Sequence, residues 1–473
     1  METLNDAIMR VTGGPTVSDG LRSYFIANGG SIVAAVAAAG GTLNDIIRAF
    51  LNSQGIPYGV LNDMWMQFLT LLSYQGTRND MEYQWWSGAN GWSPTYLFQA
   101  GEQGAWYDPS DFNSMYQDAA GTTPVTAVEQ PVGKILDKSG NGNHASQATS
   151  AARPVISARK NLLTKTEQTN VSPWAFTNAS GTATQTGNNY TFGASAVDRV
   201  LQAGVSLTTG IQVTASVTLS GSGNVRLFIL DGLGATVGAL TIALTSTPTK
   251  YTTTVTAAQT GGSGGIGIYN NAAGTAGAAF TIHNTQLEYG PTATRYQRVN
   301  TATDYDSVGF LRYLRFDGVD DLLQTAAFNF GPNVSYASAL NVRSIPTSTK
   351  SLFYFPASPT TGLLAVTTNG GTIRAYGPVS ASSVPASTAT AADKQVVVGL
   401  LTDGVAVTGY KDGVAGAPTP TSGNVAQPSA LQIGTAVSDL NFYGGITVNR
   451  LLSTTEVSAV TRYLANKSGV TVP

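Results

Sequence analysis

Apolar and polar residues alternate in several short segments of the middle and C-terminal parts of the chain. In residues 211–219, Ile-Gln-Val-Thr-Ala-Ser-Val-Thr-Leu, every second residue is apolar. Strand side chains point alternately to the two faces of a sheet, so this pattern predicts a half-buried strand. Further predicted strands cover residues 225–230, 250–256, 266–269, 363–366, 395–400 and 405–410. Many short strands separated by turn residues favour jelly-roll sandwiches and a mainly β fold.

Glycine-rich and capping residues punctuate this pattern. The run 261–265, Gly-Gly-Ser-Gly-Gly, is predicted to be a loop, because the nucleophile elbow it formally matches must open a helix and a β-like segment follows instead. The Asp-Gly pair of Lys411-Asp412-Gly413 tolerates positive φ and predicts a hairpin turn. Ser453 and Glu456 form a capping box that opens a helix through about Leu464. The apolar face of that helix comprises Val457, Val460, Tyr463 and Leu464.

The first ninety-five residues have a different pattern. Short apolar or aromatic runs follow Asn-Asp or Ser-Asp pairs, as at Asn44-Asp45 and Asn62-Asp63, and these pairs are typical of helix starts. We therefore expect a small α-helical domain over residues 1–95. Its aromatic residues either fill the core of that domain or dock onto a partner protein as an anchor, and the candidates for the anchor are Trp65, Phe68, Trp85 and Trp86.

One predicted sandwich is split by another. The stretch from residue 101 breaks off near Arg153-Pro154, and a related-looking stretch begins only at Tyr313. Residues 161–298 lie between them with a strand pattern of their own. We therefore predict a discontinuous sandwich of residues 101–158 and 310–473, with a second jelly roll inserted at 161–298.

The quoted motifs carry a resemblance to known families. The outer sandwich resembles concanavalin-like, laminin-G-type jelly rolls of phage and bacterial surface proteins, through residues 315–321, 410–413 and 449–456. The insert resembles carbohydrate-binding-module-like jelly rolls of phage virion proteins, through Asn161-Leu162-Leu163-Thr164, Trp174 and residues 286–296. The N-terminal segment, with its recurring Asn-Asp and Ser-Asp pairs, resembles segments placed ahead of such modules in phage tail and virion proteins. The resemblance implies binding and display, although not every member need bind sugar.

Composition and charge narrow the classes of function. Charged residues are 11% of the chain, with a net charge of −2 and no basic run, which argues against binding to nucleic acid. Cysteine is absent, so no disulfide framework or thiolate site is expected. No apolar stretch approaches the roughly twenty residues of a membrane span, and the N-terminus lacks the pattern of a signal peptide. These features fit a virion surface protein that is made in the host cytoplasm and released by lysis.

Sugar recognition would use an aromatic face together with side chains that bond hydroxyls. The candidates in the insert are Trp174, Tyr190, Tyr269 and Asn270, with Asn271 beside them. The candidates in the outer sandwich are Arg374 and Tyr376, with Tyr354 in support. Taken alone, each of these aromatic residues is more often part of a core than of a ligand site.

Catalytic chemistry finds little support in the residue types. His144 and His283 are the two histidines, so zinc sites and serine triads are disfavoured. Asp317, Asp320 and Asp321 cluster, either as turn and capping residues or as a calcium site. A glycosidase needs two carboxylates, so this cluster keeps a polysaccharide-degrading enzyme open as an alternative. We expect no enzymatic activity and no cofactor, with calcium as the one candidate ion.

Together these observations predict a phage virion structural protein: a tail fibre, collar or head fibre that contributes to attachment to host glycans. Its partners would be other virion proteins, through the N-terminal domain, and host cell-surface glycans. A homo-oligomer is expected because virion sites are symmetric. A decoration or connector protein that binds no glycan is the alternative within the same class.

Overall fold

The computed structural model describes residues 45, 49, 92–270, 277–342, 350–355, 364–369, 372–376, 383–384, 395–402, 406–420, 427–435 and 439–472. The chain divides into two units, Met1–Tyr96 and Leu97–Pro473. The predicted N-terminal helical domain lies outside the described residues apart from Asp45 and Ala49, which are helical, and so do the proposed anchor residues Trp65, Phe68, Trp85 and Trp86.

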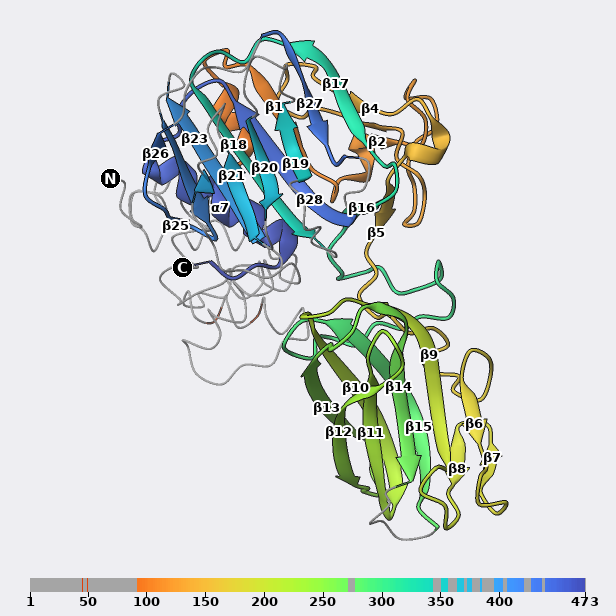
Figure 1. Ribbon diagram of the computed structural model, residues 1–473. Helices are drawn as coiled ribbons and strands as arrows, with labels where there is room; N and C mark the ends of the chain where they lie inside the picture. Colours follow the sequence, from red (N-terminus) through yellow and green to blue (C-terminus); the bar gives the residue numbers. More distant parts are fainter. Residues whose placement is uncertain are drawn as a thin grey trace. The chain divides into compact units, whose positions relative to one another are not determined.

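The second unit is mainly β, as predicted, and its strands form four sheets (Figure 1). Two sheets come from residues on both sides of the predicted insertion, and we call this pair the outer sandwich. Its first sheet contains β1 (Gly104–Tyr107), β5 (Val155–Ser157), β16 (Tyr313–Asp317), β18 (Val334–Val342), β23 (Gln395–Thr402), β24 (Ala406–Lys411), β25 (Val414–Ala415), β26 (Thr419–Pro420) and β28 (Asp439–Val448). Its second sheet contains β2 (Met115–Tyr116), β3 (Lys134–Ile135), β4 (Ala145–Ser146), β17 (Leu323–Phe328), β19 (Lys350–Phe355), β20 (Leu364–Asn369), β21 (Thr372–Tyr376), β22 (Ser383–Val384) and β27 (Ser429–Ile433).

The other two sheets come entirely from the chain between β5 and β16, and we call this pair the inserted sandwich. One sheet has the order β13 (Thr249–Thr256), β10 (Gln212–Ser222), β15 (Ala279–Tyr289), β8 (Asn189–Thr191) and β7 (Thr184–Thr186). The other has the order β12 (Thr236–Ala243), β11 (Asn224–Leu230), β14 (Gly261–Asn270), β9 (Arg199–Leu207) and β6 (Ala175–Thr177). Among the described residues, no strand of one sandwich pairs with a strand of the other. The predicted domain boundaries themselves stay a prediction.

Each sandwich has its own apolar core. Phe316, Phe353 and Phe442 are buried in the core of the outer sandwich. Val213, Val217 and Leu227 belong to the core of the inserted sandwich. The strand predicted at residues 211–219 is confirmed as β10, and its apolar members are all buried. It is more than half-buried, because Thr214 and Ser216 are buried as well. Burial of both sets removes apolar surface from water, which is the main favourable contribution to folding.

The C-terminal helix α7 (Thr454–Ser468) contacts β18, β23 and β28 (Figure 1). The predicted capping box is confirmed: the backbone N–H of Glu456 donates to Ser453 Oγ, and that of Ser453 donates to the Glu456 carboxylate. Gly469, with φ at 71°, ends the helix. Because α7 packs on one face of its sheet, every residue of β18 is buried. In the described residues, no helix is long and apolar enough to cross a membrane.

The structure corrects one turn prediction and confirms another. Residues 261–265 were predicted to be a loop, but they form the first half of strand β14 (Gly261–Asn270). A Cβ on Gly265 would lie 2.0 Å from the carbonyl oxygen of Gln202 on β9, so glycine is what allows the two backbones to approach this closely. The predicted hairpin at Asp412-Gly413 is present, with positive φ at both residues and β24 paired to β25.

Two chain segments connect the sandwiches, residues 158–161 and 297–306, and we call them the neck. Gln297 is fully buried between them. Its Oε1 accepts hydrogen bonds from the backbone N–H groups of Lys160 and Asn161. Its Nε2 donates to the carbonyl oxygens of Ala158 and Asp306. Three of these hydrogen bonds join the leaving segment, which contains Gln297, to the entering segment, and the fourth lies within the leaving segment.

Candidate functional site

Aromatic and cationic side chains gather on the outward face of the sheet β12-β11-β14-β9-β6. Arg199 and Arg226 lie directly opposite Tyr269 in the register of the two neighbouring strands. Phe228 lies two residues along β11 from Arg226. Their strand neighbours Val200, Leu227 and Ile268 belong to the core. Because successive strand side chains alternate between faces, the two arginines, Phe228 and Tyr269 point away from the core. We call Arg199, Arg226, Phe228 and Tyr269 the platform.

A glycine sets the posture of the central ring. A Cβ on Gly267 would lie 2.3 Å from Cε2 of Tyr269, so the tyrosine ring lies back over this residue. Phe228 is opposite Gly267 on β11, and its ring meets that of Tyr269 edge to face, with centroids 4.5 Å apart. Tyr269 and Phe228 are both half-buried. The tyrosine therefore lies along the sheet instead of standing away from it.

Each guanidinium of the platform lies against a ring. Arg226 is 4.7 Å from the centroid of Phe228, and Arg199 is 5.5 Å from that of Tyr269. Arg199 Nη1 is also 3.4 Å from the Tyr269 hydroxyl oxygen. The Nε atoms of both arginines are buried without a hydrogen-bond partner. Within the described residues, neither guanidinium forms an ion pair with a carboxylate, so the platform carries uncompensated positive charge.

Hydrogen bonds of Asp198 and Asn270, the residues next to Arg199 and Tyr269 in the chain, position the platform. Asp198, just before β9, accepts hydrogen bonds from the backbone N–H groups of Ala179, Ser180 and Gly193. Burial raises the pKa of Asp198, but these hydrogen bonds outweigh it and lower the pKa below its ordinary value. The backbone N–H of Asn270 donates to the carbonyl oxygen of Asp198, which fixes the start of β9 beside the end of β14. Arg199 and Tyr269 are thereby held side by side.

The predicted ligand residues of the insert divide into two groups. Tyr269 belongs to the platform. Asn270 does not face a ligand: it is 4% exposed, and its Nδ2 donates to the carbonyl oxygens of Gly193 and Ser195. Its role in the structure is to position the strand end. Asn271 lies outside the described residues.

Trp174 and Tyr190 require a correction. They are 6% and 2% exposed and lie in the apolar core of the inserted sandwich, so neither offers a ring face to a sugar. Their polar atoms are used internally. Trp174 Nε1 donates to the carbonyl oxygen of Thr164, and the Tyr190 hydroxyl donates to Thr169 Oγ1. Tyr190 also stacks on Phe280 at 5.5 Å.

The candidates in the outer sandwich remain less defined. Arg374 and Tyr376 lie on β21, but their side chains are outside the described residues. Tyr354 lies on β19 and is half-buried, and burial raises the pKa of its hydroxyl to about 12. The ligand role of these three residues stays a prediction.

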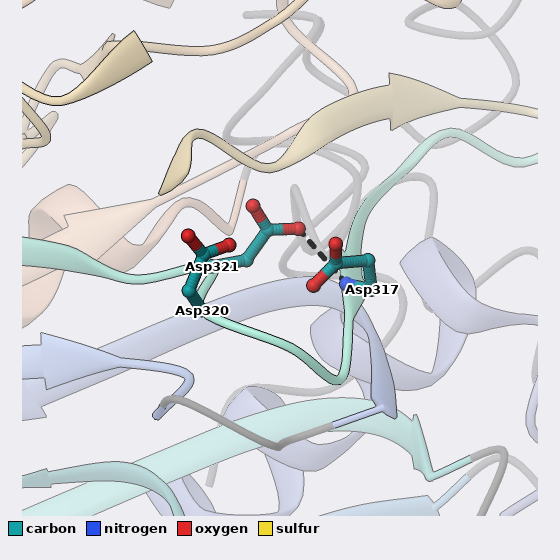
Figure 2. Close-up of side chains that lie close together, drawn as sticks. All are labelled: Asp317, Asp320 and Asp321. Atoms are coloured by element: carbon teal, nitrogen blue, oxygen red, sulfur yellow. Dashed lines mark hydrogen bonds between the residues drawn. The ribbon is translucent and has the colours of Figure 1, made fainter. Parts of the chain in front are cut away.

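The predicted acidic cluster forms at the turn that follows β16 (Figure 2). One carboxylate oxygen each of Asp317, Asp320 and Asp321 lies within 4.8 Å of the others. Asp321 Oδ2 accepts from the backbone N–H of Asp317, and Asp317 Oδ1 accepts from that of Val319. Burial, together with the two neighbouring carboxylates, raises the pKa of Asp321 to about 6. Oxygen donors of this kind suit Ca²⁺, which takes six to eight oxygen ligands.

The histidines do not form a triad in the described residues. His283 Nε2 is 2.9 Å from Ser220 Oγ, but no carboxylate hydrogen-bonds to its ring. His144 Nδ1 accepts from the backbone N–H of Asp137, which makes it a turn residue. This arrangement lacks the third group that orients the base in a serine triad.

Comparison with known proteins yields partial likenesses. No protein-family model and no curated protein sequence matches the chain. Trypanosoma rangeli sialidase in complex with the inhibitor DANA is similar over 32% of this chain and 27% of its own, at 20% identity and a TM-score of 0.27. A second structure, of Trypanosoma rangeli sialidase without a named ligand, is similar over 32% of this chain and 27% of its own, at 19% identity and a TM-score of 0.26. A structure described as "CBM4 structure and function" covers 25% of this chain and 94% of its own, at 20% identity and a TM-score of 0.20.

The expectation that the chain has no enzymatic activity is corrected by these matches. Sialidases are enzymes, and they are among the similar structures. We therefore no longer state that the chain lacks enzymatic activity. The chain spans about a quarter of the sialidase chains, 27% of each. A likeness of this extent assigns no reaction and no ligand to this chain.

Sequence reasoning missed three of the four platform residues. Arg199, Arg226 and Phe228 are not among the predicted ligand residues. They join Tyr269 only through the pairing of three strands, and that pairing cannot be read from the sequence. A partial signal existed: in residues 225–230, buried Val225, Leu227 and Ile229 place Arg226 and Phe228 on the outward face.

Proposed function

We propose that this chain is a surface appendage protein of a bacteriophage virion, and that it binds host-surface glycans through the platform. The platform is the observation that carries the glycan-binding part. Tyr269 lies along the sheet over Gly267, with the Phe228 ring at a steep angle to it, and an aromatic ring in this posture suits stacking on the apolar side of a pyranose. The flanking guanidiniums offer donors to sugar oxygens.

The virion part of the proposal is supported by the sequence. Its supports are the family resemblance, the low content of charged residues and the nested order of two sandwiches along the chain. A tail fibre, collar or head fibre carries several copies of one protein, so weak binding at each platform would add up to firm attachment. Residues 1–95 would hold the chain to other virion proteins, and a symmetric homo-oligomer would present the sandwiches.

Two experiments test the two parts separately. Antibodies against this chain should label intact phage particles in negative-stain images, and particles without label would refute the virion assignment. The full-length chain should adsorb to host cells and lose adsorption after periodate oxidation of their glycans. Unchanged adsorption after periodate, or no adsorption to any host tested, would refute glycan binding and favour a decoration or connector protein.

A further inference from the structure

The platform is unusual in its charge. Because neighbouring strands lie about 4.8 Å apart, the two arginines opposite Tyr269 are separated by roughly 10 Å across the sheet, with the ring between them. Two cations therefore border one aromatic surface. A sugar residue stacked on Tyr269 would lie within reach of both guanidiniums.

Several other arginines among the described residues have their charge or their N–H groups satisfied. Arg450 bonds the carboxylates of Glu102 and Glu456, and Arg315 pairs with Glu129 at 2.9 Å. Arg153 donates to three backbone carbonyl groups. Of the buried side-chain atoms without a partner in the described residues, the arginine atoms are the Nε atoms of Arg199 and Arg226. These Nε atoms are covered by the chain itself, so a ligand would bond the Nη atoms of the two guanidiniums.

We infer that the ligand of the platform is an acidic glycan, in which a sugar ring stacks on Tyr269 and its carboxylate binds Arg199 or Arg226. This inference rests on the proposed function. A carboxylate accepts charge-assisted, bidentate hydrogen bonds from a guanidinium, which a hydroxyl does not match. The rings of Tyr269 and Phe228 hold the guanidiniums in place before the ligand arrives, so less side-chain entropy is lost on binding.

The test compares one polysaccharide in two chemical forms. Binding of the full-length chain is measured to polygalacturonate, to the same polymer after chemical reduction of its carboxylates, and to a glycan array that holds acidic and neutral glycans. We expect acidic glycans to bind and their reduced or neutral counterparts to bind about tenfold more weakly or not at all. Binding should also weaken as sodium chloride increases, because the ion pairs lie at the surface.

Variants assign the effect to the platform. Arg199→Gln and Arg226→Gln each replace a guanidinium with a shorter, neutral amide. At least one of them should lower affinity for acidic glycans about tenfold and lower affinity for neutral glycans by a smaller factor, because a neutral sugar loses only hydrogen bonds to hydroxyl groups. Arg462→Gln, at an exposed position of α7, changes net charge equally and serves as the matched control.

The outcomes separate the inference from the proposed function. Equal binding to acidic and neutral glycans, or unchanged affinity of both Arg199→Gln and Arg226→Gln, would overturn the acidic ligand while glycan binding stood. Binding to no glycan, acidic or neutral, would overturn both.

Discussion

The platform and the turn after β16 both gather side chains of one charge, but the backbone treats them differently. At the turn, backbone N–H groups donate to Asp317 and Asp321, so two of the three carboxylates are partly accounted for by the turn itself. At the platform, the guanidiniums rest on rings, and their Nε atoms have no partner. A cluster of like charges therefore says less about a ligand than a hydrogen-bonding capacity that the fold leaves unused.

Of the changes that test this comparison, removal of the Tyr269 ring should have the largest effect on glycan affinity. Tyr269→Ala deletes the stacking surface and the support of Arg199, so we expect glycan affinity to fall about tenfold or more. Isothermal titration with a glycan that binds the unaltered chain measures the loss. Tyr96→Ala is the control, because Tyr96 is 52% exposed and lies outside the platform. Equal affinity of the two variants would remove Tyr269 from the site.

A subtler change keeps every platform side chain and moves one of them. Gly267→Ala places a methyl group where the edge of the Tyr269 ring lies, and the flexible side chain can swing away. We expect affinity to fall by roughly threefold to tenfold, because the ring loses its place while the sheet remains folded. Thermal unfolding of the same variant checks the sheet. Unchanged affinity would show that the posture of the ring is irrelevant.

At the acidic turn, the raised pKa of Asp321 predicts a pH effect of opposite sign to that of ordinary carboxylates. The pKa of about 6 in the folded chain lies above the unfolded value, so the folded state loses stability as pH rises from about 4 to about 7. Asp321→Asn keeps an oxygen acceptor for the backbone N–H of Asp317. It should raise the free energy of unfolding at pH 7 by ~1–2 kcal/mol and leave it unchanged near pH 4.

Denaturant unfolding in buffer with a chelator, at several pH values, measures this difference. The chelator matters because a bound cation would favour the ionised carboxylate. A variant that is less stable at both pH values would contradict the prediction and indicate that the backbone hydrogen bond outweighs the burial of charge.

The smallest expected effect is that of calcium. Binding of Ca²⁺ at Asp317, Asp320 and Asp321 would raise the free energy of unfolding by about 1.4 kcal/mol at ten times its Kd. Thermal unfolding with CaCl₂, with MgCl₂ and with chelator tests this, and Asp320→Asn should abolish the shift. Identical curves in all three buffers would leave the cluster as turn residues alone and would strengthen the contrast with the platform.

Local signals in the sequence predicted the elements well where one segment suffices. The alternation in residues 211–219 gave β10, and the Ser453–Glu456 capping box gave the start of α7. The glycine run 261–265 misled, because glycine marks both loops and strands whose backbones approach closely. The distinction depends on β9, which is more than fifty residues away in the sequence.

The candidate site depends even more on distant pairing. Trp174 and Tyr190 were predicted as ligand residues from their chemistry, yet both lie in the core, because an aromatic residue fits either environment. Arg199, Arg226 and Tyr269 become neighbours only through the register of three strands. Composition and local pattern contain no information about that register. Of the four platform residues, Tyr269 alone was therefore predicted.

The cross-linked neck has a mechanical consequence if the inserted sandwich is pulled, as the proposed attachment to a cell would require. A pull on the inserted sandwich would travel through two parallel segments rather than one, and Gln297 would share the load between them. Because the chain enters and leaves by the same route, tension would not draw the strands of the insert apart from opposite ends. Separation of the two segments would begin at the three hydrogen bonds by which Gln297 joins them.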